Sequence, residues 1–239
     1  MKRFLTLSLS VLLLAQIGLL FIFKVLPFRP LPLPLVEEKK ETLRFFNFNR
    51  KQDLDPWEDK TIQGKSRYWI EFEGKEGFVH GQAQESASAK YHKVRYNPQE
   101  SPYLRWRWRA ERFPNKTSGV GKNSDDYPAR IDVVFTSHFF RNFHCLEYVW
   151  DAASKEGEVR TSPHGPQIRQ IVLRNAPLGE WMEEERNVLE DYQKLFGEAP
   201  RQEIRALAIM TDADGTKSLA EGYFDNIWIG SIKQKGALS

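Results

Sequence analysis

The stretch LRWRWR, Leu104–Arg109, alternates bulky apolar residues with arginine over six positions. In a β-strand, successive side chains point to opposite faces of the sheet, so Trp106 and Trp108 share one face and the arginines share the other. The alternation therefore predicts a half-buried strand whose tryptophans face the core. A stacking surface for nucleic acid would need aromatic and cationic groups on the same accessible face, and strict alternation separates them.

The three arginines of this strand repel one another unless neighbouring strands supply carboxylates. Asp132 and Glu147 alternate onto the polar faces of candidate neighbouring strands, and we predict that they are the partners. One interpretation is an ion-pair ladder on the exterior. The other is an arginine-lined groove for an acidic ligand, with Arg107 among its binding residues.

Period-two alternation recurs along the chain from about Thr42, bounded by Gly, Pro, Asn and Asp clusters, and predicts further short strands. One stretch differs, because the apolar residues between Glu180 and Phe196 recur at helical spacing and are followed by Gly197 and Pro200. We therefore predict an all-β fold, an antiparallel sandwich with one amphipathic helix. The other predicted strands are YWIEFEG (68–74), ARIDVVF (129–135), HCLEYVW (144–150), IRQIVL (168–173), IRALAIM (204–210) and YFDNIWIGSI (223–232).

The N-terminal residues 1–24 are predicted to form a transmembrane anchor. The run Phe4–Phe23 has no charge, follows Lys2 and Arg3, and is long enough to cross a bilayer as a helix. The alternative is a cleaved signal sequence, but no small-x-small cleavage site follows Phe23. Residues 25–41 read as a stiff Pro-rich linker, and residues 42–235 as the sandwich domain.

Charge and cysteine content limit the function further. The chain has 35 Lys and Arg against 32 Asp and Glu; without Lys2, Arg3 and Lys24, the count becomes 35 − 3 = 32 against 32. A net-neutral exported part gives no reason to expect nucleic acid as a partner. The single Cys145 allows no internal disulfide, so the domain must rest on its core.

Five segments in order resemble a bacterial family of unknown function, number 3047. They are SPYLRWRWRAERFP, SDDYPARIDVVF, LEYVWD, GEWMEEERNVLEDYQKLFGEAP and AIMTDADGTKSLAEGYFDNIWIG, and the similarity covers about residues 43–232. The resemblance implies a jelly-roll sandwich similar to galactose-binding-like modules, in envelope or secreted proteins, with no established activity. With the anchor, it places the protein in the bacterial inner membrane as a single-pass protein with a periplasmic C-terminal domain.

Four aspartates suggest a cation site. Asp125 and Asp126 precede a predicted strand and Asp212 and Asp214 follow another, so they converge on one rim if both loops emerge on the same side. Such hard oxygen ligands suit Ca²⁺, with Asp212 and Asp214 as predicted ligands. The alternative is turn chemistry, which Asp and Gly favour by local hydrogen bonds.

We predict that the domain binds a ligand, an envelope glycan, without catalysis. Sugar recognition needs aromatic faces off the core, and Trp57, Trp69 and Tyr127 are the candidates, with Asp125 and Asp126 for the hydroxyl groups. One alternative is an envelope polysaccharide hydrolase or lyase that uses the Asp-rich rim, because glycoside hydrolysis needs two carboxyls at suitable separation. A second alternative is a scaffold that docks an envelope protein.

Overall fold

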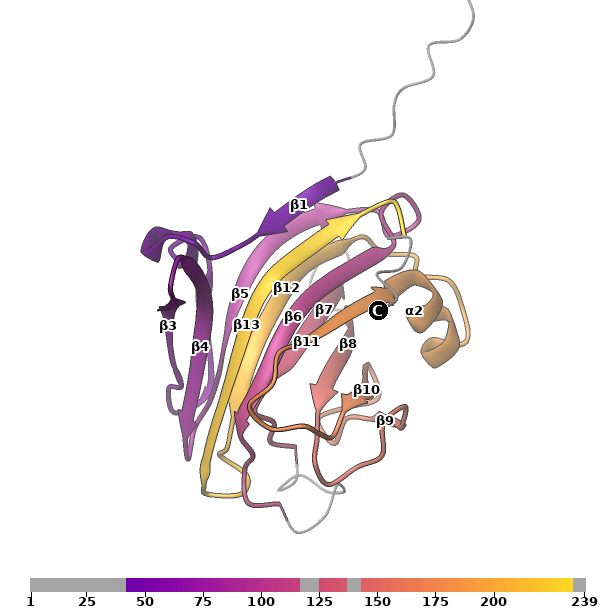
Figure 1. Cartoon of the computed structure of the whole chain (residues 1–239). Coiled ribbons are helices and arrows are strands. Elements are labelled where there is room, and N and C mark those ends of the chain that lie inside the picture. The colour runs from indigo at the N-terminus through magenta and orange to yellow at the C-terminus, as the bar shows by residue number, and fades with distance from the viewer. Residues whose placement is uncertain (1–41, 117–124, 137–142, 234–239) are drawn as a thin grey trace, which may run out of the picture. The chain divides into compact units, whose positions relative to one another are not determined.

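The computed structural model describes residues 42–116, 125–136 and 143–233, all of which belong to one compact unit. Two β-sheets pack face to face, and a short helix lies at one end (Figure 1). Sheet A has the order β11-β6-β13-β4-β3, and β1 also pairs with β13. Sheet B has the order β2-β5-β12-β7-β8-β10-β9. The chain therefore forms the predicted all-β sandwich.

The elements have these bounds. Sheet A consists of β1 (Thr42–Phe46), β3 (Arg67–Glu73), β4 (Glu76–Gln84), β6 (Tyr103–Arg112), β11 (Met182–Asn187) and β13 (Leu219–Gly230). Sheet B consists of β2 (Glu58–Gln63), β5 (Ala87–Tyr96), β7 (Arg130–Thr136), β8 (Phe143–Trp150), β9 (Val159–Thr161), β10 (Ile168–Arg174) and β12 (Ile204–Asp212). The helices are the 3₁₀ turn η1 (Lys51–Leu54) and α2 (Val188–Phe196).

The core confirms the alternation of the opening strand. Trp106 is 2% exposed and Trp108 is fully buried, whereas the arginines of β6 face outward. The two indoles pack against aromatic rings of sheet B, with centroid distances of 5.3 Å from Trp106 to Tyr148 and 5.5 Å from Trp108 to Trp150. Aromatic pairs between the sheets thus hold the sandwich together, by burial and by favourable ring geometry.

One strand pair departs from the antiparallel prediction. β10 pairs with β8 in parallel, with Ile171 opposite Tyr148. A parallel neighbour needs a long return connection. The segment 151–167, which includes β9, supplies it. Alternation of side chains cannot distinguish the two orientations, because it is the same in both.

The predicted helix from Glu180 to Phe196 is wrong in its first half. Residues Met182–Asn187 form β11 and pair with β6, and α2 begins only at Val188. The pairing places Glu183 opposite Arg107 and Glu185 opposite Arg105, so opposite charges meet across the strands. At Asn187 the side chain accepts a hydrogen bond from Glu190 N, which starts the helix.

The two sheets approach closely where glycine lacks a side chain. Gly81 of β4 pairs with Gly222 of β13, and a Cβ on Gly222 would lie 2.0 Å from the carbonyl oxygen of Pro128. A Cβ on Gly81 would lie 2.5 Å from Oγ1 of Thr211. Gly222 therefore packs directly against the backbone that leads into β7, and Gly81 against the side chain of Thr211 on β12.

In the part of the chain that the structure describes, no helix is long and apolar enough to cross a membrane. The predicted anchor Phe4–Phe23 and the Pro-rich linker lie outside the described residues.

Candidate functional site

The arginines of β6 do form an ion-pair ladder on the outer face of sheet A, but with other partners than predicted. Asp132 and Glu147 lie on β7 and β8 of sheet B, on the opposite side of the molecule's core, so that prediction is wrong. Strand order, which alternation does not reveal, decides which carboxylates are neighbours. The pairs are Arg105–Glu185 at 2.5 Å, Arg107–Asp225 at 2.6 Å and Arg109–Glu73 at 3.1 Å.

Five side chains form a continuous band across this face, which we call the aromatic row: Trp69, His80, Tyr223, Arg109 and Trp181. Trp69 pairs with His80, His80 with Tyr223 and Tyr223 with Arg109, so the row crosses four strands in register. The ring centroids lie 4.0 Å apart for Trp69 and His80, and 4.4 Å apart for His80 and Tyr223. The Arg109 guanidinium lies 4.3 Å from the Tyr223 centroid and 5.2 Å from that of Trp181.

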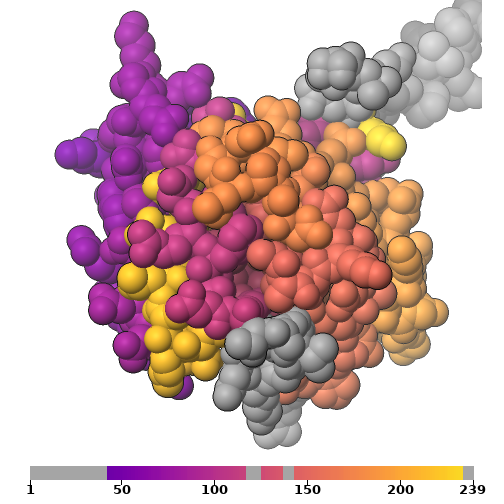
Figure 2. Space-filling view, turned by 60° about the horizontal axis from the view of Figure 1, so that its bottom comes forward, coloured from indigo at the N-terminus to yellow at the C-terminus, as the bar shows by residue number. Residues whose placement is uncertain are grey.

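The ends of the aromatic row are its accessible parts. Trp69 and Trp181 are half-buried, whereas His80 and Tyr223 between them are 8% and 7% exposed. Trp181 directly precedes β11, which pairs with β6, and Figure 2 shows magenta residues beside the orange part of the chain. Five neighbouring chain segments at about 4.8 Å spacing separate the two tryptophans by about 19 Å.

A buried histidine of the row has an unused hydrogen-bonding atom. Nδ1 of His80 lies 2.6 Å from Oε2 of Glu71, which orients the imidazole, but Nε2 is buried without a hydrogen-bond partner among the described residues. His80, Tyr223 and Trp181 were not among the predicted site residues. Alternation around the buried Phe224 would have placed Tyr223 on the outer face; His80 carries no such signal, and Trp181 was assigned to a helix.

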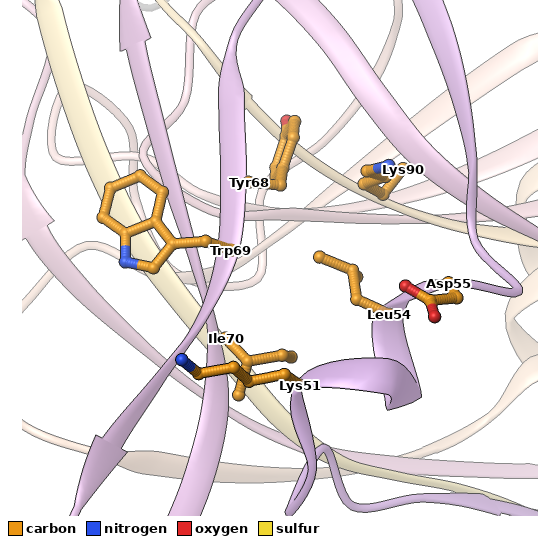
Figure 3. Close-up of a pocket in the computed structure, with 7 residues that line it drawn as sticks. All are labelled: Lys51, Leu54, Asp55, Tyr68, Trp69, Ile70 and Lys90. Atoms are coloured by element: carbon orange, nitrogen blue, oxygen red, sulfur yellow. The ribbon is translucent and has the colours of Figure 1, made fainter.

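A concave pocket of about 590 Å³ lies on the other side of the edge strand β3. Figure 3 shows that the indole of Trp69 projects from one side of β3, whereas Tyr68 lies on the other side with the residues of η1. The lining residues are Lys51, Leu54, Asp55, Tyr68, Trp69, Ile70 and Lys90.

Three of the four predicted rim aspartates do converge. Carboxylate oxygens of Asp126, Asp212 and Asp214 lie within 4.8 Å of one another. Asp126 also holds the turn that follows Asp214, since it accepts hydrogen bonds from the backbone N–H groups of Gly215 and Thr216 at 3.2 and 2.6 Å. Three clustered carboxylates fit a hard cation, so Asp212 and Asp214 stay predicted Ca²⁺ ligands, joined by Asp126.

The fourth rim aspartate, Asp125, belongs to a second group, the Arg130 cluster, which lies on the outer face of sheet B and shares Asp212 with the first group. Gln170 donates from Nε2 to Asp125 at 2.6 Å and to Glu147 at 2.7 Å. The half-exposed His164 places Nε2 3.0 Å from Oδ2 of Asp125. The cluster consists of Arg130, which is 5% exposed, and four carboxylates at these distances from its nitrogens: Asp125 at 3.8 Å, Asp132 at 3.2 Å, Glu147 at 3.9 Å and Asp212 at 3.5 Å.

The pKa values of these carboxyls shift in opposite directions, because burial raises some of them and pairing lowers another. Burial raises the pKa of Glu147 to about 7, against the opposing charge of Arg130, and burial also raises the pKa of Asp132. Burial opposes ionisation of Asp125 too, but the hydrogen bond with His164 and the charge of Arg130 outweigh it and lower the pKa of Asp125. Clusters of this kind are typical of functional sites and of structural ion networks alike.

Two predicted sugar-stacking residues are buried instead. Trp57 is 2% exposed and packs between Phe46 and Phe48, at centroid distances of 5.2 and 5.7 Å. Tyr127 is 1% exposed, and its hydroxyl donates to Asp125 at 2.9 Å. The expectation that these rings stand off the core is wrong, because loops next to a sandwich close its open edges. Trp69 and Arg107 lie on the outer face of sheet A, as predicted.

A family model for proteins of unknown function, DUF3047, matches residues 55–228. The chain belongs to this family. The DUF3047 match runs from just before β2 into β13, and so includes the aromatic row, the rim aspartates and the Arg130 cluster. No curated protein matches the chain.

Several solved β-structures are distantly similar to this DUF3047 chain. A Clostridium thermocellum xylanase 10B with CBM22-1 and GH10 modules, in complex with xylohexaose, is 11% identical, with 84% of this chain and 30% of that chain covered and a TM-score of 0.41. A mannan-recognising carbohydrate-binding module, TmCBM27, is 9% identical, with 80% and 98% covered and a TM-score of 0.39. An endo-β-1,4-glucuronan lyase from Trichoderma reesei is 8% identical, with 80% and 96% covered and a TM-score of 0.43.

Proposed function

We propose that this DUF3047 domain is a non-catalytic module that binds an oligosaccharide along the aromatic row. The observation that carries the proposal is the in-register band that ends in two half-buried tryptophans, Trp69 and Trp181, about 19 Å apart. Indole faces contact the apolar side of a sugar ring, and a separation of this size suits a short oligosaccharide better than one monosaccharide.

Polar groups beside the row supply the hydrogen bonds that sugar hydroxyls need. Gln82 donates from Nε2 to Glu221 at 2.8 Å, and the two residues lie two positions along their strands from His80 and Tyr223, on the same face. Glu71 lies on the other side of the row, and its side chain is 45% exposed. A few polar groups around an aromatic floor fix the orientation of a bound ligand.

The proposal is tested on a glycan array with the full-length protein in detergent, followed by titration calorimetry of each hit. We expect Trp69→Ala and Trp181→Ala each to weaken binding by about tenfold or more, since each removes a stacking face. Tyr91→Ala is the matched control, because Tyr91 is a half-buried aromatic on the outer face of sheet B. No glycan signal, or unchanged affinity in both tryptophan variants, would leave docking of an envelope protein as the better interpretation.

Hydrolysis is the second candidate function, favoured by one pair of residues. Asp132 and Glu147 are opposite each other on β7 and β8, and ligand atoms of their carboxyls lie within 4.8 Å. Retaining glycosidases use two carboxyls about 5–5.5 Å apart, with a raised pKa on the acid. We expect no product from any bound glycan; slow turnover that Glu147→Gln abolishes would show an enzyme instead.

We also propose that the sandwich is a jelly roll held on the periplasmic side of the bacterial inner membrane by Phe4–Phe23. The support is the uncharged run behind Lys2 and Arg3. The full-length protein should stay with membranes after alkaline extraction and be cleaved by protease added to spheroplasts. Recovery of a soluble form that begins near Val25 would show a cleaved signal sequence instead.

A further inference from the structure

The outward-facing strand residues of sheet A carry more acidic than basic groups. Arg107 faces both Asp225 and Glu76, and Arg109 lies near both Glu73 and Glu111. Two guanidinium groups are thus shared among four carboxyls. The acidic residues of this face are Glu71, Glu73, Glu76, Glu111, Glu183, Glu185, Glu221 and Asp225, and the basic residues are Arg67, Arg105, Arg107, Arg109 and Arg112.

Two of these carboxyls border the aromatic row on opposite sides. Glu71 is two residues from Trp69 on β3, and Glu221 is two residues from Tyr223 on β13. Residues at this spacing share a face and lie about 6–7 Å apart along the strand. Among the described residues Glu221 has no cationic partner within ion-pair distance, and Glu71 has only His80. Their charge is therefore available to a molecule that lies on the row.

The row also has an unused hydrogen-bonding position. His80 is 8% exposed and its Nε2 has no partner in the part of the chain that the structure describes, although buried polar atoms are nearly always paired. A stack that served the fold alone would have no need of an imidazole here, since an apolar ring would fill the same space. The histidine, held by Glu71, adds polar character to the floor of the proposed glycan site.

We infer that the ligand of the aromatic row is an oligosaccharide with free amino groups, a hexosamine chain, rather than a neutral or an acidic one. This inference rests on the proposed glycan-binding function. The sugar rings stack on Trp69 and Trp181, and ammonium groups beside them make charge-assisted hydrogen bonds to Glu71 and Glu221. Carboxylates of a uronic acid chain meet the same acidic surplus and are repelled.

The test compares four β-1,4-linked oligosaccharides of equal length by titration calorimetry with the full-length protein: glucosamine, N-acetylglucosamine, glucose and glucuronate. We expect the glucosamine chain to bind about tenfold tighter than the glucose chain, and the glucuronate chain to bind weakest. Because exposed charges are screened by salt, 0.5 M NaCl should reduce the preference for glucosamine and leave glucose binding unchanged.

Substitution of the two carboxyls tests whether they cause the preference for glucosamine. Glu71→Gln and Glu221→Gln together should weaken glucosamine binding far more than glucose binding, because the amide keeps a hydrogen bond to a hydroxyl but loses the charge, and so abolish most of the preference for glucosamine. Glu58→Gln, at an exposed carboxyl on β2 of sheet B, is the matched control and should leave the preference unchanged. Equal affinity for all four chains, a preference that survives both substitutions, or tightest binding of glucuronate would overturn the inference and leave glycan binding in place. Binding of none of them, with an empty glycan array, would overturn the proposed function itself.

Discussion

Removal of Arg107 should destabilise the protein in a way that depends strongly on pH. Asp225, its partner at 2.6 Å, has a side chain that is 2% exposed, and burial raises the pKa of Asp225 to about 6 even with the arginine present. In Arg107→Met the pKa of Asp225 should rise further, because the nearest positive charge is gone while the burial remains.

The direction and size of this pH dependence follow from the difference between the pKa of Asp225 in the folded and in the unfolded protein. A carboxyl whose folded pKa is raised above its ordinary 3.8 makes the folded state less stable as the pH rises from 3.8 to the folded pKa. In the wild type this loss ends near pH 6, whereas in Arg107→Met it continues. The pH-dependent part of the variant's extra cost is therefore close to zero at pH 5 and grows by up to 1.36 kcal/mol per pH unit above 6, to about 1.4 kcal/mol at pH 7 and about 2.7 kcal/mol at pH 8. Loss of the contact with Trp181, 4.8 Å from the guanidinium, adds about 0.5–1 kcal/mol at every pH.

Urea unfolding at pH 5, 7 and 8 measures these differences. The double variant with Asp225→Asn should lose the dependence on pH, since neither partner can then carry charge. Arg95→Met is the matched control: its partner Glu203 is 38% exposed, so the cost should stay at about 1 kcal/mol or less at each pH. An equal cost of Arg107→Met at pH 5 and pH 8 would refute the reasoning.

Three further predictions concern the core, the contact between the sheets and the rim. Trp106→Ala should lower the free energy of unfolding by about 3–5 kcal/mol in urea titrations, because the indole is 2% exposed against Tyr148; a loss below about 1 kcal/mol would contradict its place in the core. Gly222→Ala should cost about 3 kcal/mol or more in the same assay, since its Cβ would lie 2.0 Å from the Pro128 oxygen; wild-type stability would mean that the sheets can separate there. Millimolar Ca²⁺ should raise the melting temperature in scanning calorimetry and Asp214→Asn should abolish the rise; identical curves with calcium and with chelator would leave the turn as the only role of these aspartates.

Period-two alternation was enough to predict the sandwich and its inner face. Burial of Trp106 and Trp108 with the arginines outside follows from local geometry, because each side chain's direction is set by its immediate neighbours along the strand. This burial depends on a short stretch of chain, which is why the amino-acid sequence alone contains it. The convergence of Asp126 with Asp212 and Asp214 was expected only if two loops emerged on the same side, and the tertiary structure decided that condition.

Strand order and register, in contrast, depend on segments far apart in the chain. The carboxylates that face β6 come from β11, β13 and the β3–β4 hairpin, and alternation gives no indication of which strands become neighbours. The segment Met182–Asn187 became a strand although the apolar spacing from Trp181 to Phe196 suits a helix, since pairing with β6 brings opposite charges together. Trp57 and Tyr127 are buried by packing that no local pattern reports. The aromatic row exists only because four strands align in one register, so it was the tertiary structure that created the proposed site.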